Sequence, residues 1–528
     1  MALARTRAVA LVGVQGHLVD VEADVGQGVP AYALVGLPDT SLSESRDRVR
    51  AAVLNSRQPW PSSRRITVNL SPASLPKRGS GFDLAIACAV LAAQAVVPVG
   101  VFDAAVLIGE LGLDGRVRPV RGVLPAVAAA VAAGVRSAVV PAANEAEARL
   151  VPGARVTGVR SLAELVALAR GEEPPEEPAS EAGSADADPD GGAAAEPARP
   201  DAGQRDLARL DLGDVLGQPM GRFALEVAAA GGHHLLMLGP PGAGKTMLAE
   251  RLPGLLPPLD PEAALEVTAV HSVAGTLPSG TPLVTVAPFQ APHHTASVPA
   301  IVGGGSSHVR PGAASLAHRG VLFLDEAPEF APGVLDALRQ PLESGEISVA
   351  RLAAQVRFPA RFQLVLAANP CPCGMAVGRG LDCRCTPMAK VRYLARLSGP
   401  LLDRVDLRLE MLPASRAALR DDAATESTAV VAARVLAARE RMGRRLEGTP
   451  WRANAEVPGH VLRREWRLPW EVVAPAESQL DRGVLTARGV DRVLRVAWTL
   501  ADLAGRGLPD AGDVALALEY RGVERRAA

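Results

Sequence analysis

Eight consecutive residues combine glycines, a lysine and a hydroxyl in the order that binds phosphate: Gly239, Pro240, Pro241, Gly242, Ala243, Gly244, Lys245 and Thr246. An apolar run, Leu235–Leu238, precedes them as a buried strand, and Met247–Leu252 follows as a helix. The glycines let backbone N–H groups curl around phosphate oxygens, and the helix N-terminus adds a favourable dipole. Lys245 supplies a positive charge for the β- and γ-phosphates, and Thr246 a hydroxyl for Mg²⁺. The alternative is a Gly/Pro turn, but the Lys-Thr pair in this setting favours a nucleoside triphosphate site.

Two further strand ends carry side chains that would complete such a site. The apolar run Val321–Leu324 ends in Asp325, placed to hold Mg²⁺ through water, and Glu326, placed to orient and deprotonate an attacking water. Adjacent carboxylates could merely cap a helix, but beside a phosphate loop the catalytic interpretation is favoured. A third strand, Phe362–Ala367, leads to Asn369, whose amide would reach the γ-phosphate or the lytic water. Asn-Pro is also an ordinary turn signal.

Arg404 lies in a Leu-Asp-Arg segment near the end of the same region. An arginine here could act on the nucleotide of a neighbouring subunit by stabilising charge on the transferred phosphoryl group. The equal alternative is a surface ion pair with Asp403 or Asp406.

Four of the five cysteines form two Cys-x-Cys pairs: Cys371, Cys373, Cys383 and Cys385. Four thiolates in so short a span suit a tetrahedral structural Zn²⁺ just past Asn369, and we favour zinc over free thiols. Disulfides are disfavoured in a reducing cytoplasm. Cys88 is predicted to be a small core residue. His293 and His294 are not needed as ligands; they would contact substrate or shape their loop.

Length and composition bound the rest. A chain of 528 residues suggests about three domains. The formal net charge of −1 excludes a global basic field, so nucleic-acid binding would need local patches. No apolar stretch reaches membrane-spanning length, and the N-terminal run is predicted to form strands, not a signal peptide. We expect a cytoplasmic protein without membrane contact.

The elements that position these residues fall into four segments. Residues 1–168 are predicted to form an α/β domain, with strands beginning at Ala8, Val19, Ala31, Arg65, Ala105 and Ser137, and helices over Ser41–Asn55, Asp83–Ala93 and Val123–Ala133. Residues 169–206 hold ten carboxylates from Glu172 to Asp201 and no large apolar residues beyond Gly171, as in a disordered linker. Residues 207–412 form the nucleotide-binding α/β domain, and residues 413–528 a helical lid.

The order of phosphate loop, Asp-Glu strand, Asn-ended strand and Leu-Asp-Arg resembles the AAA+ ATPases of the helix-2-insert group. More narrowly, the chain resembles the ComM/YifB family of magnesium-chelatase-like ATPases. The resemblance is carried by Val215–Gln218, Ala228–His233, Gly239–Thr246, Ala291–Thr295, Gly303–Gly305 and Ser315–Phe330. It implies that ATP and Mg²⁺ are the cofactors, that Asn369 is sensor 1, and that Arg404 is an arginine finger in trans. Arg488, with Arg492 and Arg495 close by, would be sensor 2, and the subunits would form a homo-hexameric ring.

The N-terminal segment resembles a Lon-protease-like (ribosomal S5 domain 2-like) domain through Val35–Asp39, Arg65–Leu70 and Pro76–Leu84. A Lon peptidase needs a Ser nucleophile and a Lys. The alignment places Gly81 where the Ser should be, with Ser80 one residue away, and Lys77 is the sole lysine of the domain. We therefore expect no peptidase. Lys77, Arg78, Arg64 and Arg65 would form either a nucleic-acid-binding patch or a solvated face.

The leading hypothesis is a ring-forming ATPase that translocates on or remodels single-stranded or branched DNA, and the family resemblance points to branch migration during DNA uptake. Arginines in two segments are candidate contacts or solvated faces: Arg351, Arg357 and Arg361, then Arg434, Arg439, Arg441, Arg444 and Arg445. The main alternative is a protein-remodelling, chelatase-type motor acting through a protein partner. A nucleotide-gated scaffold would bind ATP without substrate-stimulated turnover.

Overall fold

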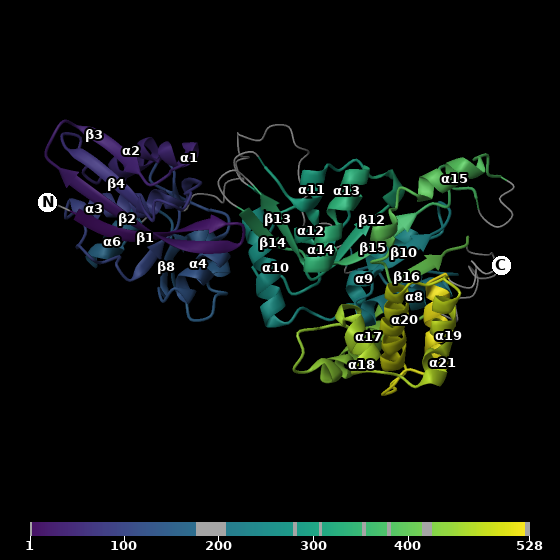
Figure 1. Cartoon of the computed structure of the whole chain (residues 1–528). Helices are drawn as coiled ribbons and strands as arrows, with labels where there is room; N and C mark the ends of the chain where they lie inside the picture. Colours follow the sequence, from purple (N-terminus) through teal and green to yellow (C-terminus); the bar gives the residue numbers. More distant parts are fainter. Residues whose placement is uncertain are drawn as a thin grey trace.

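The computed structural model describes residues 3–175, 207, 209–277, 282–305, 309–350, 355–376, 382–413 and 425–522. Most of the predicted linker and the candidate Arg351 lie outside these ranges. Figure 1 shows an elongated molecule, with the N-terminal sheet at one end, a second sheet in the middle, and a helical group below the second sheet. Within the described residues, no helix is both long enough and apolar enough to cross a membrane.

The N-terminal part is built on a seven-stranded mixed sheet in the order β3-β4-β2-β1-β5-β8-β9. Its strands are β1 (Leu3–Val12), β2 (Gln15–Gly26), β3 (Ala31–Val35), β4 (Arg65–Ser71), β5 (Ala105–Leu107), β8 (Ser137–Pro141) and β9 (Arg155–Val159), and β6 (Glu110–Leu111) pairs separately with β7 (Val117–Arg118). Its helices are α1 (Thr40–Ser43), α2 (Ser45–Asn55), α3 (Asp83–Ala93), α4 (Val123–Ala132), α5 (Glu145–Ala148) and α6 (Leu162–Arg170). The predicted elements are present, although the helix predicted over Ser41–Asn55 is divided into α1 and α2. The elements β6, β7, β9, α5 and α6 were missed.

The helix α3 lies in the core of this domain because its sequence is apolar on nearly every side. Every residue of α3 is buried, and its composition is Ala, Leu, Ile, Val and Cys apart from Asp83. A helix that is apolar on all sides must lie inside a core. Cys88 is part of that core, as predicted. The one charged residue of α3, Asp83, is buried and is paired with Arg48 of α2 at 2.7 Å.

The second sheet is entirely parallel, in the order β11-β12-β15-β10-β16. Its strands are β10 (Leu235–Leu238), β11 (Phe289–Gln290), β12 (Val321–Leu324), β15 (Gln363–Ala368) and β16 (Leu407–Glu410). The first strand in sequence, β10, lies between the fourth and fifth, so the strand order reverses there. In open parallel sheets, ligands bind outside the carboxyl ends of the strands at such a switch point. The fold thus brings the phosphate loop, the Asp-Glu pair and Asn369 to one edge.

Helices and one hairpin surround this sheet. They are α8 (Pro219–Gly231), α9 (Lys245–Leu255), α10 (Pro261–Ala274), α11 (Val298–Val302), α12 (Ala313–Leu316), α13 (Pro332–Ala337), α14 (Arg339–Ser344), the hairpin β13 (Glu346–Ala350) and β14 (Gln355–Pro359), α15 (Pro387–Leu394) and α16 (Gly399–Leu402). Figure 1 shows α15 projecting from the upper right of the body, and α10 on the side that faces the N-terminal domain.

The C-terminal group is helical throughout its described residues. It comprises α17 (Thr428–Leu446), α18 (Gly459–Arg464), α19 (Trp470–Asp481), α20 (Ala487–Leu503) and α21 (Ala511–Tyr520). Its apolar residues share one core with α8, α9 and β10. The Arg445 guanidinium lies 4.5 Å from the ring centre of Trp498 and forms an ion pair with Asp502. The group is therefore packed firmly against the phosphate-loop side of the sheet.

Candidate active site

The phosphate loop has the backbone that its glycines predict. Gly242 and Gly244 have φ values of 77° and 88°, in the left-handed region where a side chain is strained. A Cβ on Gly239 would lie 2.7 Å from the Met411 carbonyl oxygen, so only glycine fits between β10 and the end of β16. The Gly239 N–H donates to the Ala368 carbonyl at 3.1 Å, which ties the loop to the end of β15.

Lys245 is a buried cation at the start of α9. Its Nζ donates to the carbonyls of Gly239 and Pro240 at 2.8 and 2.9 Å, and to Oδ1 of Asn369 at 3.1 Å. Burial lowers the pKa of Lys245, although Asp325 and Glu326 oppose that shift. The side-chain amide of Asn369 therefore touches the phosphate-binding lysine directly, a contact that the sequence did not indicate.

Thr246 and Asp325 are joined as a magnesium site requires. The Thr246 hydroxyl donates to Oδ2 of Asp325 at 2.8 Å. A hydroxyl and a carboxylate at this separation are the oxygen donors that Mg²⁺ takes, together with water and substrate phosphate. The donor set therefore fits the ion that the sequence predicted.

Glu326 follows Asp325 in a left-handed conformation, with φ at 50°. For a residue other than glycine this conformation costs about 1 kcal/mol or more and needs support from its surroundings. Nδ1 of His294 lies 3.2 Å from Oε2 of Glu326. From the sequence, His294 was expected either to contact substrate or to shape its loop; in the structure it lies beside the proposed base. A signal was present in the chain order. His293 and His294 follow β11, which lies beside β12 in the parallel sheet, and Asp325 and Glu326 follow β12.

A cleft of about 250 Å³ opens beside these groups. Thr246, Asp325, Glu326, His293 and His294 contribute to its lining. The cleft gathers the magnesium-binding and water-activating candidates at the carboxyl edge of the sheet, where phosphate would sit in the loop. The arrangement is suited to in-line attack of water on a terminal phosphoryl group.

Arg404 lies between α16 and β16 with its guanidinium largely covered. Its Nη1 donates to the Pro400 carbonyl at 2.6 Å, and its Nη2 pairs with the carboxylate of Glu343 on α14. The alternative partners expected from the sequence were Asp403 and Asp406, so that part of the prediction was wrong. Asp406 is instead buried against His233 and Arg492.

The three sensor 2 candidates on α20 have different surroundings. Arg492 pairs with Asp406 at 2.5 Å, and Arg495 donates to the Val457 carbonyl at 2.8 Å. Arg488 is exposed at the beginning of the helix. Two of the three arginines are thus used in packing the helical group, whereas the Arg488 side chain is exposed.

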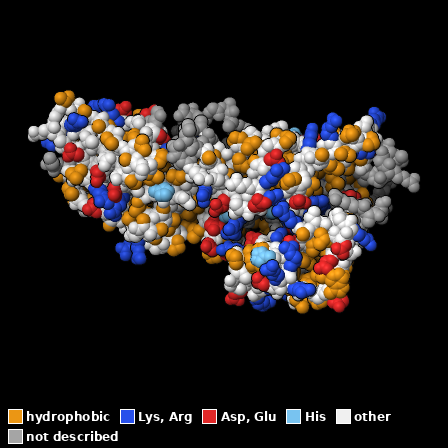
Figure 2. Space-filling view, in the orientation of Figure 1, with side chains coloured by type: hydrophobic (Ala, Val, Ile, Leu, Met, Phe, Trp, Pro, Cys, Tyr) orange, Lys and Arg blue, Asp and Glu red, His pale blue; other side chains and the backbone are white. Residues whose placement is uncertain are grey.

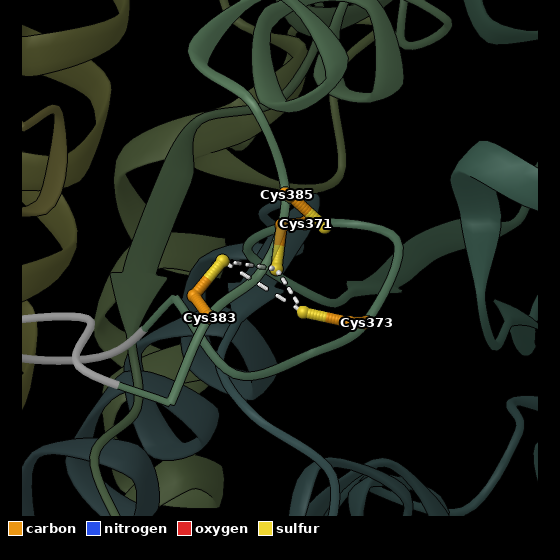
Figure 3. A group of neighbouring side chains, drawn as sticks. All are labelled: Cys371, Cys373, Cys383 and Cys385. Atoms are coloured by element: carbon orange, nitrogen blue, oxygen red, sulfur yellow. Dashed lines mark hydrogen bonds between the residues drawn. The ribbon is translucent and has the colours of Figure 1, made fainter.

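The four clustered cysteines converge as their spacing predicts. The sulfur atoms of Cys371, Cys373, Cys383 and Cys385 lie within 4.8 Å of one another. Figure 3 shows the side chains of Cys371, Cys373 and Cys383 pointing toward a common centre. A hydrogen bond from the Met375 backbone, aided by the neighbouring thiols, lowers the pKa of Cys373 to about 6. A cluster with this donor set could hold a metal ion.

Several of the candidate basic residues are occupied by contacts within the protein. Lys77 is completely buried and donates to the Pro72 carbonyl, so it cannot belong to an exposed patch. The Ser80 hydroxyl donates to Glu110, whereas Lys77 donates to Pro72, so these bonds do not join the two residues as a Ser-Lys pair. Most arginines of α17 are used internally: Arg434, Arg439, Arg441 and Arg445 bond to Glu226, Ala229 and Asp502. In Figure 2, Lys and Arg side chains are scattered among Asp and Glu on the visible face.

The parallel sheet, the phosphate loop with Lys245 and Thr246, and the Asp325-Glu326 pair define an AAA+-like P-loop protein. Sequence comparison narrows this class. Residues 21–144, 211–419 and 425–521 match three family descriptions: subunit ChlI of Mg-chelatase, magnesium chelatase subunit ChlI, and the C-terminal part of that subunit.

Relatives that match along nearly their whole length identify the family. The chain is 54% identical over 521 residues to an uncharacterised protein of Mycobacterium tuberculosis (strain ATCC 25618 / H37Rv), covering 99% of both. It is 41% identical to YifB of Escherichia coli (strain K12) and 41% identical to the competence protein ComM of Haemophilus influenzae (strain ATCC 51907 / DSM 11121 / KW20 / Rd), covering 99% of this chain and 98% of each relative. The chain belongs to the ComM/YifB family of magnesium-chelatase-like proteins. A Lon protease of Geobacter metallireducens (strain ATCC 53774 / DSM 7210 / GS-15) is 28% identical over 32% of this chain and 22% of its own length.

Proposed function

We propose that this protein is a ring-forming cytoplasmic ATPase that uses ATP and Mg²⁺ to translocate on or remodel DNA, with branch migration of recombination intermediates during DNA uptake as its role. The observation that carries the ATPase is the direct bonding of Lys245 to Asn369 and of Thr246 to Asp325 at one sheet edge. The DNA substrate is inferred from likeness to the competence protein ComM along nearly the whole chain.

In this proposal each residue has a distinct task. Backbone N–H groups of Gly239 to Gly244 cradle the phosphates, and Lys245 neutralises the β- and γ-phosphate oxygens. Thr246 and Asp325 hold Mg²⁺, which supplies charge neutralisation when bound. Glu326 takes the proton of the attacking water, held in place by His294. Asn369 senses the γ-phosphate through its contact with Lys245.

Two further positive charges would reach the nucleotide once the subunits have assembled into a ring. Arg404 of one subunit would leave Glu343 and approach the nucleotide of its neighbour, so that turnover requires assembly. Arg488 would act from the helical lid as sensor 2. A hexamer follows from the family resemblance. The four cysteines would hold a structural Zn²⁺.

A protein-remodelling motor is the second candidate. It is favoured by the match of three segments to the magnesium chelatase subunit ChlI. In that case a protein partner, not DNA, would stimulate hydrolysis. A nucleotide-gated scaffold would bind ATP with no stimulated turnover.

The deciding experiment measures phosphate release with no DNA and with single-stranded, duplex and four-way-junction DNA, at two salt concentrations. We expect stimulation and salt-sensitive binding, because contacts to phosphates release counterions. A Lys245→Ala variant is the control for contaminating ATPases. If none of these DNAs stimulated phosphate release and none showed salt-sensitive binding, the DNA motor would be ruled out. The protein-directed alternative would then remain.

A further inference from the structure

Three of the four cysteine sulfurs lie at the separations of a tetrahedral metal site, and the sulfur of Cys385 lies within 4.8 Å of them. A Zn–S bond of about 2.3 Å places the sulfurs of a zinc tetrathiolate about 3.8 Å apart. The sulfur of Cys371 lies 3.4 Å from that of Cys373 and 3.7 Å from that of Cys383, and Cys373 and Cys383 are 3.7 Å apart. These separations are too long for a disulfide bond of about 2.0 Å and close to those of a zinc centre.

This cluster lies directly against the phosphate loop. The turn Cys371–Gly374 is closed by a hydrogen bond from the Gly374 N–H to the Cys371 carbonyl at 2.9 Å. A Cβ on Gly374 would stand 2.6 Å from Cδ of Pro241, the third residue of the loop. Gly374 also has a φ of 75°. The turn that carries two of the four sulfurs is therefore packed against the loop with no space for a methyl group.

The cluster is also connected to Asn369, both through Cys371 and through the helix that follows Cys385. Cys371 is fully buried two residues after Asn369. Directly after Cys385, Thr386 caps α15, and Tyr393 of α15 returns to a hydrogen bond with the Asn369 backbone. Arg396, beyond α15, pairs with Glu329, three residues after the proposed base Glu326. The described residues that follow Cys385 thus contact Asn369, which is the partner of Lys245, and Glu329, which lies three residues after Glu326.

We propose that Cys371, Cys373, Cys383 and Cys385 bind one Zn²⁺ that braces Pro241 and Asn369, so that metal occupancy and ATP binding are coupled. The proposal rests on ATP binding at the loop, but not on DNA as the substrate. Without the ion, the turn would lose its fixed shape, and the loop and the Lys245–Asn369 contact would lose their support. The coupling is reciprocal by thermodynamic linkage, so a bound nucleotide must also raise the affinity of the four cysteines for zinc.

The first measurement is metal content together with nucleotide affinity of the full chain. We expect one zinc per chain in purified protein. Removal of the zinc with a zinc-selective chelator should raise the dissociation constant of a fluorescent ATP analogue by at least about 5-fold, the lower end of ordinary coupling. A folded zinc-free protein with unchanged affinity would overturn the proposal, as would purified protein that contains no zinc.

The second measurement is the reverse effect. Zinc release to a chromogenic chelator is followed with and without a non-hydrolysable ATP analogue, and the analogue should strengthen zinc retention by the same factor. In Lys245→Ala the analogue should have no effect, which excludes direct binding of zinc by the nucleotide. Retention that is equal with and without the analogue in the unaltered chain would refute the coupling.

A substitution tests the contact even if the zinc-free chain fails to fold. Gly374→Ala keeps every sulfur but forces a methyl group against Pro241. Gly483→Ala is the matched control, because Gly483 has a φ of 69° and open space where its Cβ would stand. We expect Gly374→Ala to retain zinc and bind the analogue at least about 5-fold more weakly than Gly483→Ala. Equal affinities would refute the brace. An unaltered chain that binds no nucleotide would instead refute the ATPase.

Discussion

Arg492 is the residue whose replacement best separates a structural from a nucleotide-facing role on α20. Its guanidinium pairs with the buried carboxylate of Asp406 at 2.5 Å and donates to the Arg404 carbonyl at 3.1 Å. Burial alone would raise the pKa of Asp406, but Arg492 and His233 hold it well below its ordinary value. Asp406 thus remains charged inside the protein, and its charge depends on these partners.

The expected cost of Arg492→Met follows from this geometry. Removing one partner of a buried ion pair costs about 3–5 kcal/mol, because the other charge stays buried. His233 remains 3.2 Å from Asp406, so we expect the low end, about 3 kcal/mol. Replacing both residues, as Asp406→Asn with Arg492→Met, should cost less than the sum of the single changes.

Urea denaturation followed by tryptophan fluorescence is the suitable assay. Four of the five tryptophans, Trp451, Trp466, Trp470 and Trp498, lie in the C-terminal group that Arg492 joins to the sheet. Arg488→Met serves as the control, with an expected change below about 0.5 kcal/mol, since it replaces an exposed side chain. If Arg492→Met kept full stability and lost only turnover, Arg492 would be the sensor and the structural reasoning would be wrong.

Three further predictions concern single side chains. Glu326→Gln should bind ATP normally but turn over at least about 100-fold more slowly, measured by phosphate release, and near-normal turnover would contradict its role as base. The pKa of Glu266, lowered to about 2 by hydrogen bonds from His318 and Arg319, implies stability present above pH 4.5 and lost as the pH falls toward 2. Glu266→Gln should therefore flatten acid denaturation in that range, and an unchanged curve would refute the link. Arg452→Ala, which breaks exposed pairs to Asp260 and Glu262, should change unfolding free energy by less than about 1 kcal/mol in urea titration; a larger loss would contradict this estimate.

The parts of the site that sequence predicted are those set by neighbouring residues. The loop from Gly239 to Thr246 depends on local backbone freedom, and Asp325 and Glu326 end a strand that is apolar enough to be recognised. Parallel strands then bring these ends together with little further information. The convergence of the cysteines followed in the same way from two short, closely spaced pairs. The roles of Glu326, Asn369, Arg404 and Arg488 stay predictions.

The parts that sequence missed depend on long-range packing of polar groups. His294 meets Glu326 across 32 positions of the chain, and nothing local to either residue predicts the contact. Arg439 was a candidate for DNA contact, yet it is half-buried and bonds to the Ala229 carbonyl. Arginine can be buried where carbonyls or carboxylates satisfy its planar group, and a single sequence does not reveal those partners. The same reason explains the failed assignment of Lys77 to a surface patch.

One helix, α10, contacts all three parts of the molecule, and its contacts differ in strength. At its C-terminal end, Ser272 is buried, bonds to Glu147 of the N-terminal domain and accepts the Gly122 N–H on its carbonyl. At its N-terminal end, Arg452 of the helical group holds it through exposed ion pairs, each worth about 0–1 kcal/mol. A buried hydrogen-bonded contact is costly to open because its polar groups would lose their partners, whereas exposed pairs exchange readily with water. If the helical group moves during a nucleotide cycle, the break at α10 therefore falls at the Arg452 end, and the N-terminal domain moves with the sheet that carries the phosphate loop.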